Sequence, residues 1–82
     1  MNQEQAAEAR KALKEIAEST DSRFYNGYSG RGMFGKECVG IVTGDPQFIE
    51  EEAVMVGIRG ARRDNMGLDY IVYWPNIPAE TD

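Results

Sequence analysis

The sequence predicts a single small α+β domain, in which an N-terminal helix packs on a sheet containing a β-α-β unit. An apolar stripe with helical spacing occupies residues 2–20, and two short apolar runs, 37–43 and 68–74, resemble strands. A helix start signal, Asp45-Pro46, lies between the two runs. The predicted order is therefore α-β-α-β. We divide residues 1–82 into an N-terminal helix (1–20), a loop rich in glycine and aromatic residues (21–36), the β-α-β unit (37–75) and a tail (76–82).

The first helix is predicted from the spacing of its apolar residues. They recur three and four positions apart, which places them on one helix face: Ala6, Ala9, Leu13, Ile16 and Ala17. Charged side chains cover the other faces, and the polar run at residues 19–22 ends the helix. This pattern is typical of a helix that packs against a sheet.

Residues 23–29, RFYNGYS, leave two structures open. The aromatic residues favour a short edge strand, whereas Asn26-Gly27 is a turn signal and favours an ordered loop. Tyr25 and Tyr28 could stack on a ligand ring, but such residues more often pack with their hydroxyls at the surface.

The glycine-rich loop has the residue spacing of two phosphate-binding motifs but lacks the helix that should follow them. Gly30, Gly32 and Gly35 fit GxGxxG, and Gly30 to Lys36 fit the first seven positions of a P-loop. Both patterns need a helix after the last glycine, since its N-terminus holds the phosphate. A predicted strand follows instead, and Glu37 stands where a P-loop has Ser or Thr. The loop is therefore interpreted as a tight turn.

The strand at residues 37–43 carries apolar side chains on both faces, which predicts a central position in the sheet. Cys38 lies in this strand, but the chain has no histidine to act as its base. We therefore expect Cys38 to be a small buried apolar residue. No carboxylate pair has a recognisable catalytic spacing, so we expect no enzyme activity, catalytic residue, cofactor or metal site.

The second helix should begin with Asp45 as N-cap and Pro46 at its first position, and run to about Ile58. Residues 54–58 form a strand in the alternative interpretation, in which the helix ends early. The run Glu50-Glu51-Glu52 is either a solvated helix start or an acidic patch for a basic partner.

The two predicted strands follow similar turns that contain Arg, Met and Gly. If the β-α-β unit is a right-handed parallel crossover, the two turns lie side by side. Cationic side chains would then surround exposed glycine amides and could hold a phosphate or carboxylate. The candidate anion-binding residues are Gly30, Arg31, Gly32, Lys36, Arg62 and Arg63.

Charge and composition restrict the location and the partners. The net charge is −5, which disfavours nucleic-acid binding because phosphates repel a negative protein. A single cysteine and the lack of an N-terminal apolar segment predict a protein of the reducing cytoplasm. No run is long enough to cross a membrane.

Segments RGMFGKECVGIV and DNMGLDYIVYWP resemble small uncharacterised proteins of bacteriophages and related mobile elements. The resemblance implies a phage-type context, in which short acidic proteins often inhibit host machinery, including host defence complexes. It attaches no activity to the chain.

Two functions follow as hypotheses. The first is a non-enzymatic inhibitor or adaptor, for example an anti-defence inhibitor of the anti-CRISPR type, that docks an acidic face on a basic surface of a host protein. The face comprises Glu50, Glu51, Glu52, Glu15 and Glu18. The alternative is a small-ligand module that binds a nucleotide or other anion at the Arg and Gly loops.

Overall fold

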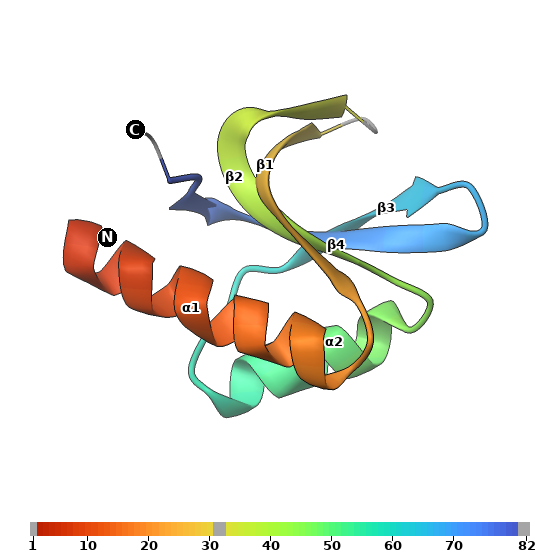
Figure 1. The fold of residues 1–82 in the computed structure, drawn as a ribbon, viewed down its shortest axis with the longest axis horizontal. Coiled ribbons are helices and arrows are strands. Elements are labelled where there is room, and N and C mark those ends of the chain that lie inside the picture. The colour runs from red at the N-terminus through yellow and green to blue at the C-terminus, as the bar shows by residue number, and fades with distance from the viewer. Residues whose placement is uncertain (1, 31–32, 81–82) are drawn as a thin grey trace.

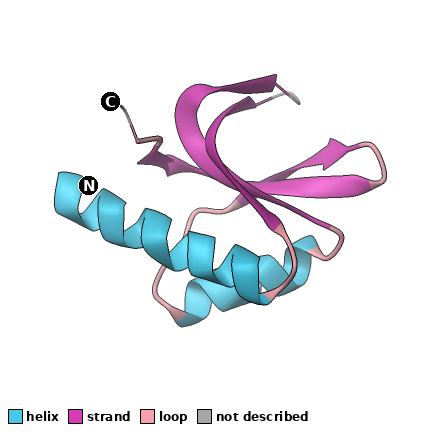
Figure 2. Ribbon diagram, viewed as in Figure 1, coloured by secondary structure: helices cyan, strands magenta, loops and turns pink. Residues whose placement is uncertain are grey.

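The computed structural model describes residues 2–30 and 33–80, and only the backbone at 33, 34 and 36. Two helices lie on one face of a four-stranded sheet, which confirms the α+β class and the N-terminal helix packed on a sheet (Figure 1, Figure 2). The elements in chain order are α1 (Gln3–Ser19), β1 (Arg23–Gly30), β2 (Met33–Thr43), α2 (Pro46–Met55), β3 (Arg62–Met66) and β4 (Asp69–Pro78).

The sheet order is β1-β2-β4-β3, and every neighbouring pair is antiparallel. Strands β2 and β3 therefore run parallel, with β4 between them, and α2 connects them as a split β-α-β unit. The prediction that residues 37–43 and 68–74 form parallel strands joined by a crossover is wrong, because Thr43 pairs with Tyr70 in an antiparallel ladder. The sequence concealed β3 because its residues, RRDNM, have no apolar alternation.

Two segments expected to be irregular are strands. The predicted loop 21–36 contains all of β1 and the start of β2, so residues 23–29 are an edge strand. Asn26-Gly27 lies where the β1–β2 register shifts between Tyr25 and Tyr28, so this signal marks an irregularity within the strand. Part of the predicted tail belongs to β4, which continues past Pro75 to Pro78 through a second register shift.

The second helix starts as predicted and ends sooner. The Asp45 side chain accepts a hydrogen bond from the Phe48 amide at 3.3 Å, and Pro46 occupies the first turn. The helix ends at Met55, and Gly57 follows with a φ of 84°, a value that favours glycine. Residues 54–58 are therefore the last helical turn and its exit, which excludes a strand there.

The main core lies between the helices and the sheet. Leu13 of α1, Ile49 of α2 and Trp74 of β4 are fully buried in one cluster. Val39 and Ile41 of β2 complete the floor of this cluster, as their alternation predicts.

The other sheet face has no helix over it and still buries a second cluster. Tyr28 is 0% exposed and packs with Cys38, Val42 and Ile71. Its hydroxyl donates a hydrogen bond of 2.8 Å to Asp64 Oδ2. Tyr28 and Asp64 lie on β1 and β3, the two edge strands, so the sheet must curl to bring them together (Figure 1).

Gly40 allows the close packing on this curled face. A Cβ atom at Gly40 would lie 2.9 Å from Ile71 Cδ1 and 3.2 Å from the Val72 carbonyl oxygen. A side chain here would require the Ile71 side chain and the Val72 carbonyl group to shift.

The Tyr28→Phe substitution should lower the free energy of unfolding by roughly 1–2 kcal/mol, because it removes a hydrogen bond to a carboxylate. Urea denaturation followed by circular dichroism measures this change. The control is Tyr70→Phe. Residue Tyr70 is 37% exposed, so this substitution should change stability by less than about 0.5 kcal/mol. Equal stability of the Tyr28→Phe variant and the wild type would show that the contact does not hold the edges together.

Candidate functional site

The five glutamates of the predicted acidic face do not form one surface. Glu50 of α2 turns toward β3, where its Oε2 atom lies 2.5 Å from Arg63 Nη2. Glu18 of α1 instead lines a cleft beside β1, at the opposite edge of the sheet. Glu15 is exposed on α1, and Glu51 is exposed on α2. The predicted face therefore divides between the two sheet edges.

Helix α2 displays apolar side chains between its carboxylates. Phe48 is 44% exposed, Val54 45%, Met55 80% and Val56, the C-cap residue, 56%. Phe48 and Met55 are seven positions apart, so they lie on the same side of the helix. Among the described residues, only two other large hydrophobic side chains are exposed, Leu68 and Tyr70. The helical spacing of this segment predicts that Ile49, Ala53 and Val56 are buried. Ile49 and Ala53 are, whereas Val56 is exposed because the helix ends before it, at Met55.

A shallow hollow of about 350 Å³ borders the same helix on its β3 side. Val54 lies in its lining, and polar or charged side chains form the rest: Gln47, Glu50, Glu51 and Arg63. Gln47 Nε2 donates a hydrogen bond of 3.2 Å to Glu51 Oε1. The Glu50–Arg63 ion pair fixes the far wall, so this hollow can accept one apolar side chain beside an acidic rim.

Of the candidate anion-binding residues, those that the structure describes, Gly30, Arg62 and Arg63, are not gathered around one point. Arg62 and Arg63 are neighbours on β3, so their side chains leave opposite faces of the sheet. Arg63 pairs with Glu50 on the helix face, while Arg62 lines a hollow of about 420 Å³ with Arg59 and Gly60. Arg31 and Gly32 and the side chain of Lys36 lie outside the described residues.

Gly30 does approach β3, and the described side chains around it include two carboxylates. It lines a cavity of about 300 Å³ on the curled face, with Ser29, Cys38 and Tyr73. Two carboxylates, those of Glu37 and Asp64, line the same cavity. Negative charge at these positions repels a phosphate or carboxylate.

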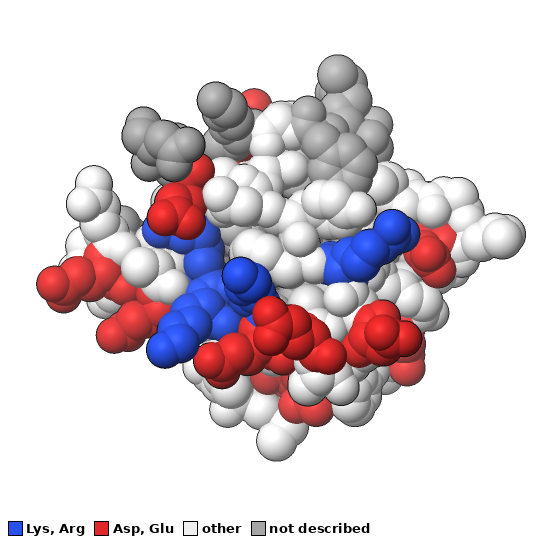
Figure 3. Space-filling view, in the orientation of Figure 1, with Lys and Arg blue, Asp and Glu red and all other residues white. Residues whose placement is uncertain are grey.

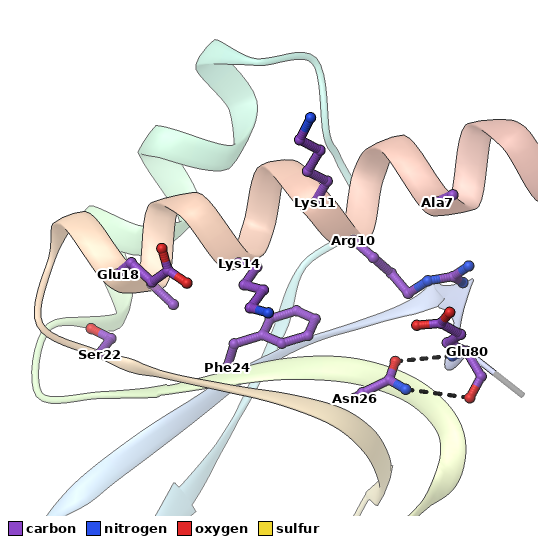
Figure 4. A pocket seen from close by; sticks show the side chains of 10 residues that line it. Ala7, Arg10, Lys11, Lys14, Glu18, Ser22, Phe24, Asn26 and Glu80 are labelled. Carbon is purple, nitrogen blue, oxygen red and sulfur yellow. Dashed lines mark hydrogen bonds between the residues drawn. The ribbon is translucent and has the colours of Figure 1, made fainter. Parts of the chain in front are cut away.

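A hollow of about 620 Å³ lies between α1 and β1. Figure 3 shows Lys and Arg side chains gathered where α1 meets the sheet, with Asp and Glu side chains bordering them. Figure 4 shows the cleft itself. Its lining comes from both elements and from the C-terminal segment: Ala7, Arg10, Lys11, Lys14, Ala17, Glu18, Ser22, Phe24, Asn26 and Glu80.

One end of this cleft is fixed by hydrogen bonds. Asn26 Nδ2 donates to the Glu80 carbonyl oxygen at 3.3 Å, and the Glu80 amide donates to Asn26 Oδ1 at 2.9 Å (Figure 4). Arg10 Nη1 donates to the Pro78 carbonyl oxygen at 2.7 Å. The sequence contained a signal for this site, since Arg10 and Lys14 are four positions apart and share a helix flank.

Cys38 is buried between β1 and β4, and its Sγ atom donates to the Tyr28 carbonyl oxygen at 3.2 Å. Burial raises the pKa of the Cys38 thiol above its ordinary value of 9.0, and the charge of Glu37 adds to the rise. These observations confirm the predicted buried position. The thiol is neutral at physiological pH, which makes it a poor nucleophile.

Comparisons with protein-family models, with curated proteins and with solved structures find no match to this chain. Of the described helices, none is both long and apolar enough to cross a lipid bilayer. Within residues 2–30 and 33–80, no group of three Cys, Asp or Glu side chains is placed to hold a metal ion.

Cys38 should react with a thiol reagent at pH 8 at least about tenfold more slowly in the folded protein than in urea, because it is buried and neutral. The release of thionitrobenzoate from Ellman's reagent measures both rates. Since the folded pKa is raised, the stability contributed by the neutral thiol should be lost as pH rises above 9.0. The Cys38→Ser variant should lack this loss, and equal labelling rates in the two states would contradict the burial.

Proposed function

We propose that the chain is a non-enzymatic binding protein that docks the exposed side of α2 on a basic surface of a partner protein. One observation carries the proposal: Phe48, Met55 and Val56 are exposed beside the carboxylates of Glu51 and Glu52. Interfaces commonly combine a few apolar anchors with a charged rim. The α2 surface, defined as Phe48, Glu51, Glu52, Val54, Met55 and Val56, has this composition.

The chemistry of the partner follows from this surface. Met55 is unbranched and flexible, so it can fill irregular apolar recesses in another protein. Glu51 and Glu52 favour Lys or Arg around such a recess, and the net charge of −5 would accelerate the approach of a basic protein. Glu50 is already paired with Arg63, so it contributes less to a partner than its two neighbours.

The resemblance to phage and mobile-element proteins favours a host protein as the partner. A short chain that covers a basic surface would act as an inhibitor if that surface serves another ligand, or as an adaptor if it does not. An anti-defence role is one form of such inhibition.

Substitution of Met55 by Lys should reduce partner capture about tenfold or more, because it removes an apolar anchor and repels a basic surface. Affinity capture from a host lysate with the tagged chain, followed by quantitative mass spectrometry, measures the effect. Glu51→Lys should also reduce capture of the same proteins, and the reduction should be larger at lower salt concentration, where charges are screened less. Met55 is 80% exposed, so its variant should unfold within about 0.5 kcal/mol of the wild type.

Leu68→Lys and Glu4→Lys are the matched controls, since they make the same changes at exposed positions away from α2. Both controls should capture the partner as the wild type does. Equal losses in controls and α2 variants, or full capture by Met55→Lys, would refute the α2 surface as the docking site.

A further inference from the structure

We propose that the cleft between α1 and β1 binds a small aromatic anion of the nucleoside monophosphate type. The site is separate from the α2 surface, because it lies at the β1 edge of the sheet and α2 contacts β3 at the other. A volume of about 620 Å³ falls in the range of small-molecule sites, which is roughly 300–1,000 Å³.

The charges of the cleft favour an anion. Three cationic side chains, those of Arg10, Lys11 and Lys14, line it against two carboxylates, those of Glu18 and Glu80. This excess of positive charge stands out in a chain with a net charge of −5. Among the described residues, neither Arg10 nor Lys14 forms an ion pair, so these two cations keep their charge available to a ligand.

The anion would bind between Lys14, which lies over Phe24, and Arg10, which lies at the Glu80 end of the cleft (Figure 4). Arg10 uses one donor for the Pro78 carbonyl oxygen, which orients the guanidinium and leaves its other N–H groups for a ligand. Lys14 extends from the next turn of α1 toward β1 (Figure 4). A phosphate monoester carries close to two negative charges at pH 7, which matches these two cations.

The remaining lining suits a ring and a hydroxylated sugar. Phe24 is half-buried in β1 and lies below Lys14 in Figure 4, where a flat ring can stack on it. Ala7 and Ala17 are small side chains of α1 that leave room above the strand. Glu18 and Ser22 lie at the opposite end from Arg10, and the Glu18 carboxylate can accept hydrogen bonds from ribose hydroxyls (Figure 4).

The test is a titration of the full-length, ¹⁵N-labelled chain with adenosine monophosphate, followed by NMR. The amide signals of Lys14, Ser22 and Phe24 should shift and saturate. Adenosine lacks the phosphate group and inorganic phosphate lacks the nucleoside, so each should bind about tenfold more weakly than adenosine monophosphate. Lys14→Gln should weaken adenosine monophosphate about fivefold to tenfold, because it removes a charge-assisted hydrogen bond.

Arg59→Gln is the matched control, since Arg59 is exposed and lines a different hollow. It should leave the affinity unchanged. Phe24→Leu should weaken adenosine monophosphate and leave inorganic phosphate unaffected, which assigns the ring to Phe24. The proposal is overturned if no signal shifts saturably, if the shifts map to Arg59 and Arg62, or if Lys14→Gln and Arg59→Gln act alike. Equal binding of phosphate and adenosine monophosphate would overturn the aromatic part.

Discussion

The fold depends on the curl that brings its two edge strands together. Helices cover only one face of the sheet, so a flat sheet would leave Cys38, Val42 and Ile71 in water. The curl buries them, and the Tyr28 hydroxyl reaches Asp64 across the face that results. The tilted contact between the Tyr28 and Tyr73 rings, with centroids 4.9 Å apart, fills the space below that hydrogen bond. A chain of this length thereby obtains a second apolar cluster without a third layer.

The same arrangement determines which surfaces remain available. Because β4 lies between β2 and β3, α2 must cross two strand positions and comes to lie near the β3 edge. Helix α1 precedes β1 and packs over that strand, so the two helices border opposite edges. One helix therefore presents an exposed apolar and acidic side, and the other forms a cationic cleft with the strand beside it.

Local sequence patterns predicted both helices and two of the four strands. The spacing of Ala9, Leu13 and Ala17 predicted α1, and Asp45-Pro46 predicted the first turn of α2, because caps and periodicity are local. The two apolar runs predicted β2 and β4 for the same reason. Strand β3 was missed because Arg63 and Asp64 are held by partners on other elements, Glu50 and Tyr28, and no local pattern reveals these contacts. Without β3, the partner of β2 was assigned the wrong direction, which placed the arginine-containing turns together.

The candidate sites also combine features that local sequence patterns predict with features that depend on long-range contacts. The acidic run on α2 was visible in the sequence, but Glu50 was lost from it through pairing with Arg63. The α1–β1 cleft joins Arg10 and Lys14 to Glu80, a residue at the far end of the chain. A long-range juxtaposition of this kind needs the tertiary fold before it can be seen.

The irregular pairing of β1 also affects how a strand of another molecule could add to the sheet. Exposed edge strands are templates on which other chains can polymerise. Here the C-terminal segment is fastened alongside β1 by two hydrogen bonds, and irregular register bends that strand near the same place. An incoming strand meets a border distorted between Tyr25 and Tyr28, which disfavours regular pairing along β1.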